Sequence, residues 1–212
     1  MKYSLLQIIK KIKKNGFAYY YPTLFQLLRN FLRPKWQRLF IFESPLGGII
    51  PNEYSNDIKV ELLRGVDDKL LSFANRRGAW YLTQTKDLFL KGNICFSAVI
   101  DGKMASCLWT SFNEVYLPDI EYTIKTPPEV VSLIDGYTLE EYRGKGLYKI
   151  LWNDCLNYLV KIKKYTKIYG FINNKNKRSL NVHDKLNLNK IIYDITLLKL
   201  FGIRIHIKNK IS

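Results

Sequence analysis

The sequence predicts an α+β domain built on a mixed, mostly antiparallel sheet flanked by helices. Three observations predict it: apolar runs separated by turn residues recur from residue 58 onward, a strand leads through glycines into a helix near residue 140, and two apolar runs close the chain. A strand meander, then strand–helix–strand–helix, then two strands is an order typical of helices packed on one sheet. The 212 residues are 47% hydrophobic, which is enough for one sizeable core.

The first fifty residues are predicted to form a basic, amphipathic helical appendage. Residues 3–14 place apolar side chains on one helical face and lysines largely on the other, and a second helical stretch runs from Pro22 to Phe31. The breaker PLGG at 45–48 gives the boundary, so we assign 1–50 to the appendage and 51–212 to the main domain. The apolar helix face could pack on the main domain, on a second copy of the chain as a homodimer, or on an anionic membrane, and the sequence leaves these open.

Local patterns predict the elements between residues 58 and 139. Ile58 to Leu63 alternates as a strand does, and Asp67 precedes a helical stretch. Two apolar runs flank Asp101-Gly102, a strong hairpin signal because both residues tolerate a left-handed turn. The strands expected in this region beyond the first are Ile94–Ile100, Met104–Trp109, Tyr116–Ile124 and Val130–Leu139.

Downstream of residue 146, apolar residues recur at helical spacing up to Ile162, which predicts a helix. The rest of the chain is interpreted as a strand, a short helix and a terminal hairpin, formed by Ile168–Ile172, Ser179–Leu186, Ile191–Leu200 and Ile203–Ile207.

The net charge of +16 is concentrated at the two ends of the chain. Residues 1–40 hold nine Lys/Arg and no acid, residues 161–212 hold thirteen against two acids, and residues 41–160 hold twelve against sixteen. Basic ends indicate an anionic partner such as a membrane surface, nucleic acid or a phosphorylated ligand, although a lysine-rich composition alone also produces them. Nucleic acid is the weaker candidate, because no reading module or aromatic stacking pattern accompanies the charge.

The three cysteines, Cys95, Cys107 and Cys155, are scattered and lack CxxC or histidine partners. They fit neither a disulfide framework nor a zinc site, so we expect no metal and a reducing compartment. No apolar run reaches the length of a membrane span, and lysines interrupt the N-terminal apolar stretch without a following cleavage site. The sequence therefore predicts a cytoplasmic protein, with peripheral contact at the inner membrane face if the basic helix binds lipid.

The turn Arg143-Gly144-Lys145-Gly146 stands between a predicted strand and a predicted helix. Amides at a helix N-terminus lack internal partners, and glycines let an anion approach them closely. The turn is neither a GxxxxGK[ST] P-loop nor a three-glycine dinucleotide fingerprint. It either binds a pyrophosphate or simply turns the chain, and the residues alone leave both interpretations open.

The stretch Tyr137 to Tyr148 resembles motif A of the GNAT superfamily of acyl-CoA-dependent N-acetyltransferases, in which a strand leads through (Q/R)-x-x-G-x-(G/A) into a helix. Arg143 and Gly146 match its first two defining positions. Tyr148 stands where Gly or Ala is usual, and Glu140 stands where many members have Pro.

Residues 176–188 resemble motif B of the same superfamily, N-x-x-S-x-x-x-Y-x-K-x-G-F. Asn176 and Ser179 match, His183 takes the Tyr position, and Asn187-Leu188 replaces Gly-Phe. The resemblance spans residues 55–207.

This resemblance implies a GNAT fold with acetyl-CoA, or another acyl-CoA, as co-substrate and no metal. Pantetheine would lie between the strand ending at residues 138 and 139 and the strand 168–172, and amides of residues 143–148 would hold the pyrophosphate. The expected cofactor-binding residues are Thr138, Leu139, Arg143, Gly144, Lys145, Gly146, Leu147, Tyr148, Asn176 and Ser179. For Asn176 a helix N-cap, and for Lys145 a solvated side chain, remain alternative roles.

The chemistry that the resemblance implies is direct attack of an amine on the thioester, assisted by proximity and a base that keeps the amine neutral. His183 is the expected acid for the leaving thiolate, and Asp135 and Glu121 are the expected bases. Each of these also fits a structural role, packing or capping for the histidine and an ordinary surface position for the carboxylates. The aromatic residues Trp80-Tyr81 and Trp109 either line a substrate cleft or belong to the core.

The resemblance therefore implies an N-acetyltransferase, an acyltransferase of the EC 2.3.1 class, acting on an amine of a small molecule or of a sugar or envelope precursor. Two alternatives remain open. One is a non-catalytic GNAT-like module that binds coenzyme A or another partner, and the other is an N-acyltransferase that uses acyl carrier protein as donor.

Overall fold

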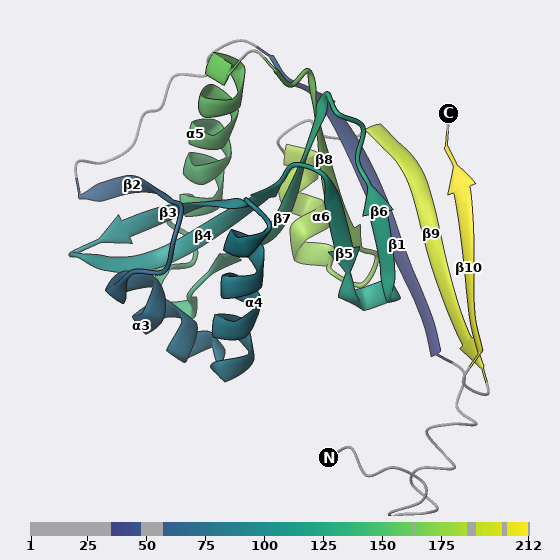
Figure 1. The fold of residues 1–212 in the computed structure, drawn as a ribbon, viewed down its shortest axis with the longest axis horizontal. Helices are drawn as coiled ribbons and strands as arrows, with labels where there is room; N and C mark the ends of the chain where they lie inside the picture. Colours follow the sequence, from purple (N-terminus) through teal and green to yellow (C-terminus); the bar gives the residue numbers. More distant parts are fainter. Residues whose placement is uncertain (1–34, 48–56, 163, 186–189, 201–202, 212) are drawn as a thin grey trace, which may run out of the picture.

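In the part of the chain that the structure describes, eight strands form one sheet, and helices pack on it (Figure 1). The computed structural model describes residues 35–47, 57–162, 164–185, 190–200 and 203–211. The strands are β1 (Lys35–Pro45), β2 (Ile58–Leu63), β3 (Ile94–Ile100), β4 (Lys103–Ser111), β7 (Val130–Thr138), β8 (Lys167–Asn173), β9 (Lys190–Leu200) and β10 (Ile203–Lys210). In space they run β10-β9-β1-β8-β7-β4-β3-β2; β7 and β8 pair in parallel and the other neighbours are antiparallel.

Helices cover both faces of this sheet, which confirms the predicted α+β class. They are α3 (Asp68–Arg77), α4 (Ala79–Leu90), α5 (Leu147–Ile162) and α6 (Lys177–Lys185). Figure 1 shows α5 on one side of the sheet and α3 and α4 on the other. Alternation along β3 explains the two layers: Ile94 and Phe96 pack in the cluster with α5, whereas Cys95 packs with α3 and α4. Every residue of β3 is therefore buried.

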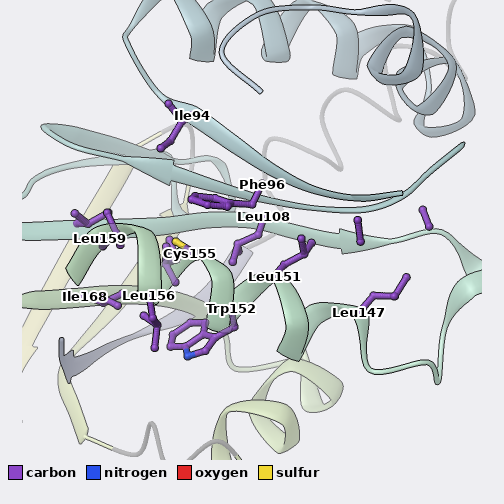
Figure 2. Packing of buried hydrophobic residues seen from close by; sticks show 14 of the residues in the cluster. Ile94, Phe96, Leu108, Leu147, Leu151, Trp152, Cys155, Leu156, Leu159 and Ile168 are labelled. Atoms are coloured by element: carbon purple, nitrogen blue, oxygen red, sulfur yellow. The ribbon is translucent and has the colours of Figure 1, made fainter. Parts of the chain in front are cut away.

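The apolar stripe of α5 fixes this helix on the sheet (Figure 2). Leu147, Leu151, Cys155 and Leu159 recur at helical spacing and are almost fully buried against residues such as Phe96 of β3. Burial of each large apolar side chain contributes about 1.5–3 kcal/mol. The position of the turn that precedes α5 is therefore set by a rigid helix.

The hairpin and the first helix start where the local sequence signals predicted. Asp101 and Gly102 have φ values of 49° and 72°, as a two-residue hairpin turn between β3 and β4 requires. The side chain of Asp67 accepts a hydrogen bond of 2.8 Å from the amide of Leu70 and caps α3.

Strand β1 corrects the prediction of a helical appendage over residues 1–50. Lys35–Pro45 lies inside the sheet, where it pairs with both β8 and β9. Leu39 and Ile41 are buried in a core formed with residues of β9, such as Ile195, and with Val115 and Ile124. Residues 35–45 therefore belong to the main domain.

Two further differences concern the middle of the chain. The expected single strand Tyr116–Ile124 is wrong: β5 (Glu114–Leu117) and β6 (Tyr122–Lys125) form a separate two-stranded sheet. Pro118 begins a 3₁₀ turn between them, and Glu121 has a left-handed φ of 47°, so the chain reverses there. Helix α4 was not predicted; only Gly78 separates it from α3.

Several predictions lie outside the described residues. These are the helices expected in 3–14 and 22–31, with the membrane or homodimer contact assigned to them, and the motif B positions 187 and 188. Among the residues that are described, no helix is long and apolar enough to cross a membrane.

Candidate functional site

Strands β7 and β8 separate in the middle of the sheet. Their parallel pairing runs from Val130 opposite Lys167 to Leu133 opposite Gly170, although β7 continues to Thr138 and β8 to Asn173. A bulge lies at the point of separation, where Asp135 and Gly136 of β7 stand opposite the single residue Leu108 of β4. A bulge bends its strand, so β7 turns away from β8 beyond this point.

The bulge is held by a largely buried arginine. Both oxygens of Asp135, whose φ is 44°, accept hydrogen bonds from the Arg77 guanidinium, at 2.7 and 3.0 Å. The side chain of Arg77 is 9% exposed, and its guanidinium lies 3.9 Å and 4.1 Å from the ring centres of Tyr81 and Tyr137. The ion pair and the two cation–π contacts thus fix the backbone conformation at the point where the strands part.

A cleft of about 690 Å³ opens between the separated strands. One part of its wall comes from β7, β8 and α6, including Gly136, Gly170 and His183. The other part comes from α4, β5 and the turn after β5, including Trp80 and Asp119. The volume is in the range of small-molecule and cofactor sites.

The turn before α5 presents free main-chain amides. Gly144 and Gly146 have φ values of +84° and +72°, which favour glycine, and no heavy atom lies within 4 Å of where a Cβ would stand on either. In the described structure no hydrogen bond is recorded for the amides of residues 144–146, and those of residues 147–149 lie in the first turn of the helix, where internal partners are absent. This arrangement suits an anion.

The basic side chains of the turn point in different directions. Arg143 Nε donates to the carbonyl of Thr138 at 3.2 Å, and Arg143 Nη1 pairs with Glu140 at 2.8 Å. Lys145 is exposed, with its Nζ 5.6 Å from the ring centre of Tyr142. Arg143 therefore braces the end of β7, while Lys145 remains accessible to an anion at the turn.

The main-chain groups of Leu139, expected to bind pantetheine, are already bonded. Its amide donates to Ala105 at 3.0 Å and its carbonyl accepts from Tyr142 at 3.0 Å. The carbonyl of Thr138 accepts from Arg143. Pantetheine bonding at Leu139 or at the carbonyl of Thr138 would have to displace these contacts, and neither residue is among those that line the cleft.

Asn176 and Ser179 stand at the start of α6, and both line the cleft. The side chain of Asn176 accepts a hydrogen bond of 3.1 Å from the amide of Ser179. The capping role left open by the sequence is thus present, and it places both side chains at the cleft wall.

His183 and Tyr148 form a pair inside the cleft. His183 is 4% exposed, contacts the rings of Phe42 and Trp152, and lies with its Nε2 3.2 Å from the hydroxyl of Tyr148. Burial lowers the pKa of His183 to about 4 and raises that of Tyr148. The lowered pKa favours the neutral imidazole at neutral pH, so an acid role of His183, which stays a prediction, would use the N–H of the neutral ring.

The two carboxylates expected as bases lie in different places. Asp135 lines the cleft, but both of its oxygens are bonded to Arg77. Glu121 pairs with Lys199 of β9 and Arg204 of β10, and hydrogen bonding by Lys199 lowers its pKa. Glu121 does not line the cleft, so the structure does not bring it together with His183.

The aromatic residues divide between cleft and core. Trp80 is 60% exposed and lines the cleft, whereas Tyr81 and Trp109 are fully buried and joined by a hydrogen bond of 3.0 Å. Over the described ranges, no group of three or more His, Cys, Asp and Glu side chains forms a metal site, and the three cysteines are buried and unpaired.

Sequence reasoning missed three features of this site. They are Arg77, which braces the bulge, the hydroxyl of Tyr148 beside His183, and two carboxylates on the cleft wall, Asp87 and Glu114, which form no ion pair with any residue that the structure describes. Each feature joins residues far apart in the chain. Gly136, which faces the ring of Tyr148, is a sequence signal for the bulge itself, because glycine inside a strand often marks a bulge.

Comparisons with known proteins give a consistent result. A sequence profile described as the acetyltransferase (GNAT) family matches residues 65–188, which is more than half of the chain. A search of curated protein sequences finds no match.

Solved structures resemble the chain at low identity. A Drosophila protein has a TM-score of 0.56 at 12% identity, covering 86% of this chain and 58% of its own. A tandem GNAT protein from the clavulanic acid biosynthesis pathway has a TM-score of 0.54 at 13% identity, covering 90% and 58%. A GNAT protein from Novosphingobium aromaticivorans has a TM-score of 0.51 at 14% identity, covering 85% and 68%. This chain spans just under three fifths of the first two proteins, and the likeness is one of fold.

Proposed function

Since the chain belongs to the acetyltransferase (GNAT) family, we propose that it transfers an acetyl group from acetyl-CoA to an amine by direct attack of the nitrogen on the thioester. The acceptor is an amine of a small molecule or of a sugar or envelope precursor. The protein acts in the cytoplasm.

One observation carries this proposal: β7 and β8 stop pairing at Leu133 and Gly170, and a cleft opens there. An extended thioester arm can lie in such an opening, where the outward main-chain groups of β7 have lost their strand partner. Asn176 and Ser179 on the same cleft supply polar side chains for the amides of the arm.

The turn before α5 supports binding of the donor's pyrophosphate. Its amides are free, the space above both glycines is open, and the exposed Lys145 adds positive charge. The N-terminal end of the helix dipole adds a further attraction for negative charge.

The opposite wall of the cleft supports a positively charged amine as acceptor. Asp87, Glu114 and Asp119 line the cleft together with a single cation, Lys91, and in the described structure none of the three carboxylates forms an ion pair. The chain carries a net charge of +16, so unpaired carboxylates gathered in one cleft are an exception to its surface. They would attract an ammonium group and orient it toward the thioester.

The test begins with calorimetric titration of coenzyme A into the chain, followed by thiol release from acetyl-CoA with a panel of primary amines. We expect binding, and thiol release that depends on the amine. A chain that binds no coenzyme A contradicts the proposal.

A matched pair of variants locates the binding site. Gly146→Ala and Gly102→Ala place alanine at the same left-handed φ of +72°, with open space around the new Cβ in both cases. Only Gly146 lies at the turn, so Gly146→Ala should weaken coenzyme A binding about 10- to 100-fold, the value of one hydrogen bond to a charged group. Equal affinities in the two variants would contradict the assignment of the pyrophosphate to this turn.

A binding module without catalysis is the second candidate, and one observation favours it. Asp135, the expected base that does lie at the cleft, is fully engaged by Arg77. Coenzyme A binding without amine-dependent thiol release, from acetyl-CoA or from an acyl carrier protein thioester, would favour this function over the enzyme.

A further inference from the structure

Strands β1, β9 and β10 lie together at one edge of the sheet and expose apolar side chains (Figure 1). Three isoleucines at alternate positions of β10, Ile203, Ile205 and Ile207, are between 44% and 64% exposed. Trp36 of β1 is 57% exposed. Alternate residues of a strand lie on the same face of its sheet, so the three isoleucines share one face.

The strand register joins these side chains into one patch. Leu198 of β9 stands opposite Trp36 of β1 and opposite Ile205 of β10, so the three form a row across the strands. Leu200 stands opposite Ile203 and adds a second row. Side chains opposite each other in this way lie about 4.5–5.5 Å apart at Cβ. We call this patch the outer apolar face; its members are Trp36, Leu198, Leu200, Ile203, Ile205 and Ile207.

The opposite face of the same strands is covered. Leu39 of β1 is buried in the core there, and His206 of β10 has its Nε2 2.7 Å from a carbonyl oxygen of the turn between β5 and β6. On the outer side, Phe42 lies on the same face of β1 as Trp36 and packs against His183 of α6. The described helices therefore cover this side at one end of β1 and leave it open at the other.

The chain enters the outer apolar face from residues 1–34, which lie outside the described residues. The sequence predicts a helix over 22–31, with leucine or phenylalanine at positions 24, 25, 27, 28 and 31 and polar residues at 23, 26, 29 and 30. Five Cα steps join Phe31 to Trp36, a reach of at most about 18 Å. A segment with an apolar stripe is thus tethered beside an apolar face.

The dimensions of the predicted helix match those of the face. Ten helical residues are about 15 Å long, and a helix with its side chains is about 10–12 Å wide. Three strands span about 10 Å across, and the run from Ile203 to Ile207 is about 13 Å long. One helix of this length is therefore enough to cover the outer apolar face.

A second copy of the chain and an anionic membrane fit this face less well. A segment on so short a tether acts at an effective concentration of about millimolar, which a second copy would have to match. Strand β10 carries Arg204, Lys208 and Lys210 and no acid, so pairing its edge with the same strand of another copy would oppose like charges. The charged side chains that β1 and β9 place on this face, Arg38 and Asp194, pair with each other, which leaves no excess positive charge there for lipid headgroups.

We propose that residues 22–31 lie across the outer apolar face and cover it. Contiguous exposed apolar patches normally mark an interaction site, and here the site and its occupant belong to the same chain. Residues 22–31 are then part of the domain and not an appendage to it. The inference does not depend on the transferase activity proposed above.

Thiol labelling of the full chain measures whether the face is covered. Cys95, Cys107 and Cys155 are buried, so the wild type gives the background. Ile205→Cys and Val66→Cys are labelled with N-ethylmaleimide, and each rate is divided by that of the same variant unfolded in urea. Ile205 is 48% exposed and Val66 37% exposed, so an open face lets Ile205→Cys react at least as fast. We expect it to react at least about 10-fold more slowly, because the segment must first open.

Substitutions in the segment identify what covers the face. Leu24→Ser with Leu28→Ser removes two side chains from the apolar stripe. Gln26→Ser with Asn30→Ser is the matched control, because it makes the same change at the same spacing on the polar side of the predicted helix. In the Ile205→Cys background the leucine pair should restore fast labelling, and the control pair should leave labelling slow.

Val66→Cys combined with either pair should label at its original rate, which separates opening of the face from general unfolding. Labelling of Ile205→Cys as fast as that of Val66→Cys would show an open face and overturn the inference, as would slow labelling that survives the leucine pair. Protection that is lost on dilution, with dimers in analytical ultracentrifugation, would assign the face to a second copy instead. Protection that appears only when phosphatidylglycerol vesicles are added would assign it to a lipid surface.

Discussion

Replacing Gly136 with alanine adds a methyl group where the structure has no room for one. The new Cβ would stand 2.5 Å from Cε2 and 3.2 Å from Cδ2 of the Tyr148 ring. The φ of Gly136 is not in the left-handed region, so backbone strain does not contribute. Gly→Ala at an unstrained site usually stabilises by about 0.4–1 kcal/mol, whereas overpacking costs about 1–3 kcal/mol. The steric cost is larger, and we expect net destabilisation.

Thermal unfolding followed by circular dichroism measures this effect. A loss of about 1–2 kcal/mol lowers the Tm by about 2–8 °C in a chain of this size. Gly65→Ala is the control, since no atom lies within 4 Å of its Cβ position and its φ is also ordinary. It should leave the Tm unchanged or slightly raised.

A double-mutant cycle shows whether the ring of Tyr148 is the cause. Tyr148→Leu removes the ring atoms that the new methyl group would meet, so Gly136→Ala should cost little in that background. A coupling of about 0.5–3 kcal/mol is expected for residues in contact. Equal destabilisation in both backgrounds, or a Gly136→Ala variant as stable as Gly65→Ala, would refute the packing that we describe at the bulge.

Three further predictions concern stability. The pKa of His183 is about 4 in the folded chain and about 6.5 in the unfolded chain, so the unfolded state binds the proton first as the pH falls. The free energy of unfolding should therefore fall by up to about 3 kcal/mol between pH 6.5 and pH 4. His183→Phe should remove this part of the pH dependence when unfolding by urea is measured. Arg77→Leu should lower the free energy of unfolding by about 2–4 kcal/mol because Asp135 loses its partner. The double variant Arg77→Leu with Asp135→Asn should recover part of that loss in the same assay. If it recovers nothing, the ion pair does not stabilise the fold. Asp67→Ala should lower the free energy of unfolding by about 1 kcal/mol through loss of the cap on Leu70, whereas an unchanged value would show that the cap contributes nothing.

Elements whose signals are local in the sequence could be predicted. The hairpin at Asp101-Gly102, the cap at Asp67 and the helix after Gly146 each depend on residues within about one turn of each other. The glycine turn and the separation of the two strands followed from the motif resemblance, because a motif describes local backbone.

Elements whose position depends on distant partners could not be predicted. Lys35–Pro45 is a strand because β8 and β9, more than 120 residues later, flank it on both sides, and its composition alone does not say so. The start of α4 depends on a single glycine, Gly78, whose φ of 110° ends α3 and allows a new helix direction. A sequence pattern does not distinguish such a junction from a loop.

The chemistry of the site was the least predictable part. His183 was expected as an acid from its motif position, and the burial that lowers its pKa depends on packing against rings such as those of Phe42 and Trp152. Asp135 was expected as a base, but Arg77, 58 residues away, holds it. These effects arise from packing between elements, which no spacing along the chain reveals.

Titration of coenzyme A into the chain labelled with ¹⁵N only at glycine tests the central claim most directly. Two-dimensional NMR then reports the main chain at the turn and at the cleft separately. We predict that the amide signals of Gly144, Gly146, Gly136 and Gly170 move on binding, while those of Gly65 and Gly102, which lie elsewhere in the fold, stay in place. Binding that leaves the signals of Gly144 and Gly146 unmoved would contradict the account.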